Sequence, residues 1–274
     1  MSYFGFLALF IGVPLIILAF LTWRDAYQGR NTPKRLSSYS PWIVLFAHVL
    51  VAVIYTTPWD NYLVATSVWW YDPDLVTGIT LGWVPIEEYT FFVVQTLFTG
   101  LWLLFWARRW ARWDESKGWE NGRLRSLSVL FLAFIWLINA IVLAIGWQPG
   151  TYLALQLTWA LVPVMIQLGF GADILWRYRS LVAVGLIPTT LYLAFADALA
   201  IQSGTWTIDP VQSVGWLLGG VLPIEEFLFF FLTNLLVVFG VTLVLAEESQ
   251  KRVEELGLKD LLMSLSKSWR LKRS

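Results

Sequence analysis

Seven long apolar stretches constrain the fold of this chain more than any other feature of its sequence. A helix that crosses a bilayer needs ~20 apolar residues, and an apolar segment surrounded by lipid satisfies its backbone hydrogen bonds only as a helix. The predicted spans are 3–22, 42–57, 79–106, 126–146, 152–172, 181–201 and 214–246. Only 14% of the residues are charged, compared with about 25% in soluble domains. The sequence therefore predicts an all-α polytopic membrane protein with seven transmembrane helices, forming a single transmembrane domain over residues 1–274.

The basic residues divide the predicted loops into two sets. All 19 Lys and Arg residues lie in the segments 23–41, 107–125, 173–180 and 247–274. The loops on the other side carry acidic residues, which are Asp60, Asp72, Asp74 and Asp209. Because loops rich in Lys and Arg stay in the cytoplasm, we expect a multi-pass protein of the cell membrane with its N-terminus outside and its C-terminus in the cytoplasm. The charged tail 247–274 is interpreted as a solvated end in preference to an interfacial helix.

The chain also repeats itself. The tetrapeptide Pro-Ile-Glu-Glu occurs in the third and seventh spans, 138 residues apart. Upstream residues repeat at an offset of 137, which pairs Trp69 with Trp206, Asp72-Pro73 with Asp209-Pro210, and Gly78 with Gly215. This pattern predicts internal repeats 1–106 and 150–246, with 126–146 as a linking helix. The additional span makes the two three-helix units parallel, related by an axis along the membrane normal.

The tetrapeptides place four glutamates inside apolar spans, where an ionisable side chain is costly and is a functional candidate by default. At ~1.5 Å per residue, ten residues of helix place Glu87 ~15 Å into its span, near the middle of the hydrocarbon. Burial and a second carboxyl nearby keep one carboxylic acid protonated beside a carboxylate, an arrangement suited to acid–base chemistry. The predicted catalytic residues are Glu87, Glu88, Glu225 and Glu226.

Other residues near the tetrapeptides predict an apolar binding site. Aromatic faces can stabilise a cation where water is absent, and a buried amide or acid can either join helices or line a cavity. The predicted substrate-binding residues are Trp69, Trp83, Phe91, Trp206, Phe229, Asn234 and Asp197. The single His, His48, and the absence of Cys predict no metal site and no thiol chemistry. Nucleic-acid binding is excluded because the basic residues form no stripe with stacking aromatics.

The paired Pro-x-Glu-Glu segments, each followed by aromatic residues and preceded by Trp and Gly, resemble the membrane-integral lycopene cyclases. The resemblance covers most of residues 1–246. It implies cyclisation of the ψ end groups of lycopene to β-carotene through γ-carotene, with the four glutamates as acid and base. It also implies that no redox cofactor takes part, because this cyclisation consumes no electrons.

The resemblance implies lycopene or a related linear carotenoid from the bilayer as the substrate. A second copy of the chain and other membrane enzymes of carotenoid biosynthesis are candidate partners. Two alternatives remain open, which are a cyclase for ε rings or fifty-carbon chains and a proton-coupled transporter. A retinal protein is excluded because all six Lys residues lie outside the predicted spans.

Overall fold

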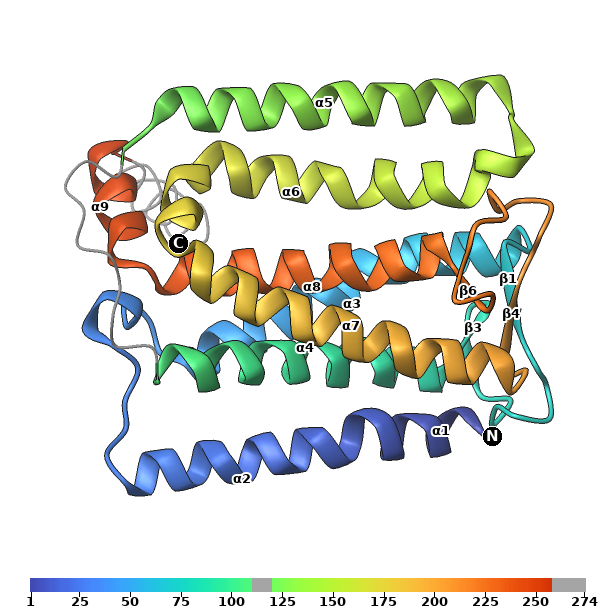
Figure 1. Cartoon of the computed structure of the whole chain (residues 1–274), viewed down its shortest axis with the longest axis horizontal. Helices are drawn as coiled ribbons and strands as arrows, with labels where there is room; N and C mark the ends of the chain where they lie inside the picture. The colour runs from blue at the N-terminus through green and yellow to red at the C-terminus, as the bar shows by residue number, and fades with distance from the viewer. Residues whose placement is uncertain (110–119, 258–274) are drawn as a thin grey trace, which may run out of the picture.

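The computed structural model describes residues 1–109 and 120–257, in which seven segments are helical, long and apolar enough to cross a bilayer. They run side by side along one axis (Figure 1). In chain order they are Tyr3–Tyr27 (α1 Tyr3–Phe6, the π-helix η1 Leu7–Gly12 and α2 Val13–Tyr27), α3 (Pro41–Ala65), α4 (Ile86–Ala107), α5 (Gly122–Ile145), α6 (Thr151–Arg177), α7 (Arg179–Gln202) and α8 (Ile224–Leu245). The prediction of an all-α polytopic membrane protein is confirmed. The 3-10 turns η2 (Lys34–Leu36) and η3 (Gln148–Gly150) precede α3 and α6, and α9 (Glu247–Glu255) follows α8.

Short β-strands mark one end of the bundle, called the strand end here, and α9 marks the opposite end, called the α9 end (Figure 1). At the strand end, β1 (Trp69–Tyr71) pairs antiparallel with β4 (Trp206–Ile208), with Trp70 opposite Thr207. Two hairpins stand beside this ribbon. They are β2 (Thr80–Leu81) with β3 (Val84–Pro85), and β5 (Leu217–Leu218) with β6 (Leu222–Pro223). The β1–β4 ribbon therefore joins the first half of the chain to the second.

Helix α3 is longer than predicted. We expected the second span to end at residue 57, before Pro58. The structure continues the helix through Pro58 to Ala65. The Thr57 hydroxyl donates to a carbonyl one turn back (2.6 Å), and such side-chain bonds help a spanning helix to tolerate a proline. Asp60 was predicted in the outer loop, and this is wrong: it lies in α3 and is 1% exposed.

The third and seventh spans were predicted to begin at residues 79 and 214, but their helices begin at Ile86 and Ile224. The preceding apolar residues form the hairpins instead, since Gly82 takes a left-handed conformation (φ +71°) that favours glycine. Pro85 is extended, as a cap before a helix requires. The ten residues of helix expected before Glu87 are therefore not there, and both glutamate pairs lie in the first helical turn at the strand end.

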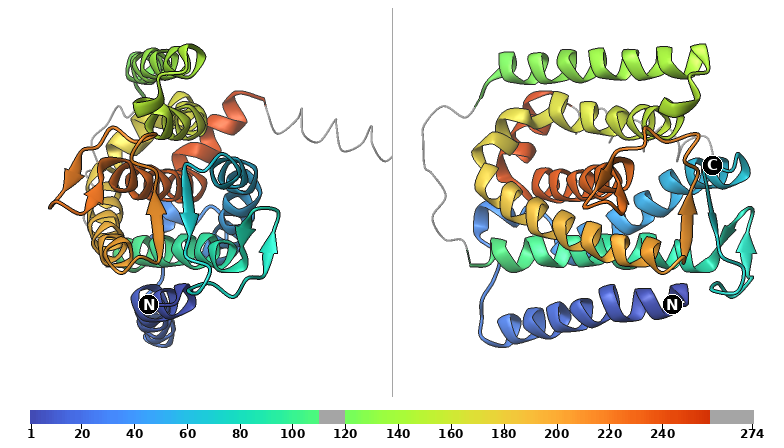
Figure 2. Two further views of the ribbon diagram at one scale, coloured as in Figure 1. Left: turned by 90° about the vertical axis from the view of Figure 1, so that its right-hand side faces the viewer. Right: turned by 45° about the vertical axis from the view of Figure 1, so that its right-hand side comes forward.

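The helices differ in how deeply they lie within the bundle. Helices α4 and α8 are central and their two faces are largely covered, whereas Asn139 is the buried residue of α5. Helix α5 packs on α6 at the outside of the molecule (Figure 2). The two glutamate-bearing helices are thus the ones most enclosed by protein.

The charged tail was predicted to be a solvated end, and for its first turns this is wrong. Helix α9 is packed against the bundle, with Glu248, Ser249 and Arg252 buried. The Arg252 guanidinium donates to both carboxylate oxygens of Asp173 in α6 at 2.9 Å. Residues 258–274 and the loop 110–119 lie outside the described residues.

Candidate functional site

The first glutamate of each pair holds the loop that precedes its helix. The Glu87 carboxylate accepts the backbone N–H of Thr77 at 2.6 Å. Glu225 accepts the backbone N–H of Val214 at 2.8 Å and the hydroxyl of Ser213 at 3.0 Å. Both carboxyls lie at a helix N-terminus, where free N–H groups and the helix dipole favour negative charge. These two glutamates therefore position the segments between the β1–β4 ribbon and the hairpins.

The second glutamate of each pair is held by buried tyrosines. Glu88 accepts the phenol O–H of Tyr3 at 2.5 Å and of Tyr71 at 3.0 Å. Glu226 accepts the phenol O–H of Tyr152 at 2.5 Å. Burial, and next the nearby carboxyls, raise the pKa of Tyr71 well above its ordinary value, so that this phenol keeps its proton and remains a donor.

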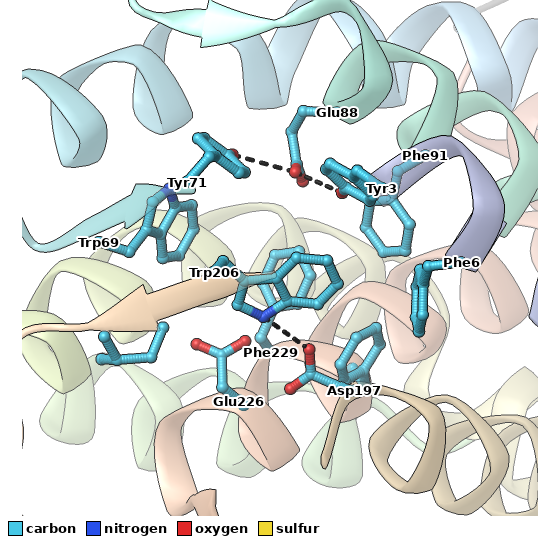
Figure 3. A pocket seen from close by; sticks show the side chains of 12 residues that line it. Tyr3, Phe6, Trp69, Tyr71, Glu88, Phe91, Asp197, Trp206, Glu226 and Phe229 are labelled. Carbon is cyan, nitrogen blue, oxygen red and sulfur yellow. Dashed lines mark hydrogen bonds between the residues drawn. The ribbon is translucent and has the colours of Figure 1, made fainter. Parts of the chain in front are cut away.

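Glu88 and Glu226 meet at one cavity. They point into it from α4 and α8, with the ring of Trp206 beside them (Figure 3). The cavity has a volume of about 40 Å³. Its other walls come from α1, the β1–β4 ribbon, α4, α7 and α8, and consist of Tyr3, Phe6, Trp69, Tyr71, Phe91, Asp197, Ile208, Phe229 and Phe230. The two halves of the chain therefore contribute matching carboxyl groups to a single aromatic site.

The aromatic rings around the cavity pack closely on one another. Trp206 contacts Tyr3 and Phe6, with ring centroids 4.9 and 5.2 Å apart. On the other side, Phe91 stacks on Phe229 at 6.3 Å. A cavity of this size has room for about one water molecule, so the rings must move apart before any larger group can lie between the two carboxyls.

Two aspartates extend the acidic cluster. Asp197, on α7, accepts the indole N–H of Trp206 at 3.1 Å. Asp60, on α3, lies within electrostatic range of Glu88 and Glu226. Within residues 1–109 and 120–257, neither carboxyl oxygen of Asp60 has a hydrogen-bond partner, nor does the indole N–H of Trp69. The bond between Asp197 and Trp206 in one half therefore has no counterpart between Asp60 and Trp69 in the other.

Comparison with known proteins identifies the family. The chain is 35% identical over 243 residues to the protein named lycopene beta-cyclase of Halobacterium salinarum, with 88% of this chain and 95% of that protein covered. The chain belongs to the lycopene cyclase family. It is also 38% identical over 238 residues to the bifunctional lycopene cyclase/phytoene synthase of Phaeosphaeria nodorum, covering 83% of this chain and 38% of that protein. No family model matches the chain, and no solved structure does.

The structure brings most of the sequence-predicted site residues of this family member together, but not all of them. Glu88, Glu226, Trp69, Phe91, Trp206, Phe229 and Asp197 line the cavity. Glu87 and Glu225 lie behind it and bind loops. Trp83 lies on a hairpin turn and is 67% exposed, which places it away from the cavity.

Asn234 is not at the cavity either. Its side-chain oxygen accepts from Gln95 (2.9 Å) and Thr99 (2.6 Å) of α4, and its amide donates to Thr190 of α7 (3.3 Å). The residue is 0% exposed. Asn234 therefore joins α8 to α4 and α7, which was one of the two roles expected for it.

The three tyrosines were not predicted from the sequence, although a signal for two of them was present. Val13-Pro14 and Val162-Pro163 stand 149 residues apart, and the same offset carries Tyr3 onto Tyr152. In the structure each of these tyrosines donates to the second glutamate of its own half. Tyr71 has no such counterpart, because the offset of 137 carries it onto Ile208.

Proposed function

We propose that this protein is a lycopene beta-cyclase that closes the ψ end groups of lycopene by acid–base catalysis. The observation that carries the proposal is the pair of buried carboxyls, Glu88 and Glu226, that face one aromatic cavity. Family membership supports the same reaction, because the relative that matches nearly the whole chain is named for it. The substrate is a hydrocarbon dissolved in the bilayer, and a site formed by spanning helices can receive it directly.

The reaction needs one proton donor and one proton acceptor. A carboxylic acid protonates carbon 2 of the terminal double bond and leaves a cation at carbon 1. The double bond between carbons 5 and 6 attacks this cation, so that a bond forms between carbons 1 and 6 and the cation moves to carbon 5. Loss of the proton on carbon 6 to a carboxylate gives the β ring. One proton is gained and one is lost, so the reaction is an isomerisation.

The hydrogen bonds of the site support a division of the two roles. Two phenol donors at Glu88 stabilise its carboxylate form, because hydrogen bonds to a charged acceptor favour the charge. Among the described residues Tyr152 is the one donor at Glu226, and the nearby aspartates act on both glutamates alike. Glu226 is therefore the acid and Glu88 the base.

The aromatic walls have a separate role in this proposal. The faces of Trp206, Phe91 and Phe229 border the space between the two carboxyls, and such faces attract a carbocation in a site without water. A dry site also prevents water from trapping the cation as an alcohol. These side chains stabilise the cation and protect it until Glu88 removes the proton.

The orientation in the membrane and the division into repeats are part of the same proposal. The strand end, with Asp72, Asp74 and Asp209, lies outside, and the α9 end, with the basic residues, lies in the cytoplasm. Residues 1–106 and 150–246 form the parallel repeats, supported by the matching positions of Glu88 and Glu226. Self-association and contact with other carotenoid enzymes would pass the insoluble substrate along within the bilayer.

Reconstitution tests the proposed function. Purified protein in liposomes that contain lycopene, without flavin or nicotinamide, is expected to form γ-carotene and then β-carotene. In deuterated water each new ring should carry one deuterium at carbon 2, because an exchangeable carboxyl supplies that proton. Folded protein that forms no cyclic product, or rings without deuterium, would refute the acid–base proposal.

A further inference from the structure

Two larger cavities follow the carboxyl cavity along the bundle, where α3 and α6 both pack on α8. The nearer one has a volume of about 390 Å³ and is lined from α3, α4, α6 and α8. The farther one, of about 540 Å³, reaches α9. Both are lined by His48, Gln167 and Val244, so they are adjacent, and together they are called the α3–α6 groove here.

The Phe229 ring stands between the groove and the cavity that holds Glu88 and Glu226. Phe229 lines both the carboxyl cavity and the nearer part of the groove. Its ring is stacked on Trp59 with centroids 6.0 Å apart, and Trp59 stacks on Trp159 at 4.4 Å. Rotation of the Phe229 ring would join the small cavity to the large one, which is also the way to gain room for an end group.

We propose that the α3–α6 groove holds the polyene chain of the substrate while one end group lies between Glu88 and Glu226. This inference rests on the cyclase function proposed above and extends it to the part of the substrate that does not react. An end group occupies only one tip of lycopene, and the rigid conjugated chain behind it needs a straight apolar path.

The length of the groove fits such a chain. Phe229 and Val244 of α8 both line the nearer part, and the fifteen residue steps from one to the other span ~22 Å of helix. The farther part continues to α9. A forty-carbon polyene is comparable in length with the bilayer hydrocarbon core, about 30 Å. An acyl chain of a phospholipid reaches only about half of that thickness, so a polyene fits the groove better than a lipid tail does.

The groove is accessible from the bilayer. Val51 and Tyr55 line it and are 63% and 38% exposed. Tyr55 also bridges to α6, because its hydroxyl donates to the carbonyl of Trp159 at 2.9 Å. A hydrocarbon can therefore enter from the bilayer between α3 and α6, on the α9 side of the contact between Tyr55 and Trp159, without crossing water.

This arrangement has a consequence for the order of the two cyclisations. When one end group lies at the strand end, the other lies near α9, far from both carboxyls. The monocyclic product must leave the groove and turn around before its second end can react. Free γ-carotene is therefore an obligatory intermediate that accumulates early.

Blocking the groove tests the inference. Ala52 is a half-buried lining residue of α3, and Ala52→Trp would fill the path of the polyene. Ile54, 63% exposed, lies ~200° around the same helix, so Ile54→Trp is the matched control. Each variant is assayed with lycopene and with a truncated analogue that keeps the ψ end group but not the long polyene.

We expect Ala52→Trp to lower kcat/KM for lycopene at least ~10-fold, the usual scale of overpacking a filled site. The truncated analogue should be cyclised as in the unmodified protein, and Ile54→Trp should be unaffected with both substrates. Equal turnover of lycopene by Ala52→Trp would overturn the groove assignment and leave the cyclase proposal intact. If the unmodified protein cyclises neither substrate, both proposals fail.

A second measurement remains decisive if Ala52→Trp does not fold. A photoreactive benzophenone amino acid replaces Val51, at the groove, or Ile54, outside it, in phosphatidylcholine liposomes that contain lycopene. After illumination, mass spectrometry should find a lycopene adduct at position 51 and phospholipid adducts at position 54. Phospholipid adducts alone at position 51 would overturn the proposal, because the groove would then hold lipid.

Discussion

The roles of the four glutamates can be distinguished by replacing each carboxyl with an amide. Glu88→Gln and Glu226→Gln are expected to lower the cyclisation rate ~10²–10⁴-fold, the usual contribution of general acid–base catalysis, which is about 3–5 kcal/mol of barrier. The amide keeps the size of the side chain, and its oxygen can still accept from the tyrosines. The loss should therefore appear in the rate and not in stability.

The other two glutamates give the matched controls. Glu87 and Glu225 bind backbone N–H groups at 2.6 and 2.8 Å, and an amide oxygen can accept the same bonds. The change from a charged to a neutral acceptor costs about 1 kcal/mol. Glu87→Gln and Glu225→Gln should thus lower the rate less than ~10-fold, although the two residues are as deeply buried as their neighbours.

The assay measures initial rates in lycopene-containing liposomes at matched protein levels, with cyclic products separated by chromatography and folding checked by thermal unfolding. Product analysis also distinguishes the glutamate that acts as the acid from the one that acts as the base. Loss of the acid, in Glu226→Gln, should slow the reaction without changing the ring type. Loss of the base, in Glu88→Gln, should let the cation lose a different proton, so that the proportion of ε to β rings rises.

Three results would contradict this reasoning. Near-normal rates in both Glu88→Gln and Glu226→Gln would show that neither carboxyl transfers a proton. Equal losses in all four variants would show that the orientation of the side chains toward the cavity does not decide their role. A loss confined to one half of the chain would mean that the two halves do not share one site.

Three further predictions concern the base, the packing of α9 and the topology. Tyr71→Phe removes one of the two phenol donors from the base, so we expect a loss of about tenfold in rate and an acid limb of the pH–rate profile that moves to higher pH. Arg252→Ala leaves the buried carboxylate of Asp173 without its two-bond partner, and thermal unfolding should show a loss of about 3 kcal/mol in stability. Because the chain has no Cys, single Asp74→Cys and Glu120→Cys variants should react with an impermeant thiol reagent from opposite sides of the membrane; reaction from one side would refute the proposed topology.

The sequence predicted the spanning helices correctly and singled out the carboxyl groups as candidates, because both inferences follow from the cost of placing polar groups in lipid. Long apolar stretches can only be helices there, and a carboxyl such as Glu88 or Glu226 is too costly to be incidental. The starting points of α4 and α8 were not predictable in the same way. Residues 79–85 are as apolar as a helix, and only the turn at Gly82 and the pairing of β2 with β3 separate them from it.

The roles within each glutamate pair depend on neighbours that come from other elements of the fold. Adjacent residues on a helix differ in direction by ~100°, so the sequence alone could not say which one faces the cavity. The structure decides this through Tyr3 and Tyr71, which reach Glu88 from another helix and from β1. Asp60 was misplaced because α3 continues past Pro58, where the Thr57 hydroxyl donates to a backbone carbonyl one turn back.

The amino-acid sequence by itself determined that this chain is a seven-helix membrane protein with two matched acidic motifs, because a lipid environment tests each segment separately for length and apolarity. Only the tertiary structure decided where the motifs meet and which carboxyl of each pair faces the cavity. It also decided that, among the described residues, Glu88 accepts hydrogen bonds from two phenols and Glu226 from one. Those properties depend on contacts between different elements, from Tyr71 with Glu88 (|i−j| = 17) to Tyr3 with Glu88 (|i−j| = 85), and no local pattern in the sequence specifies them.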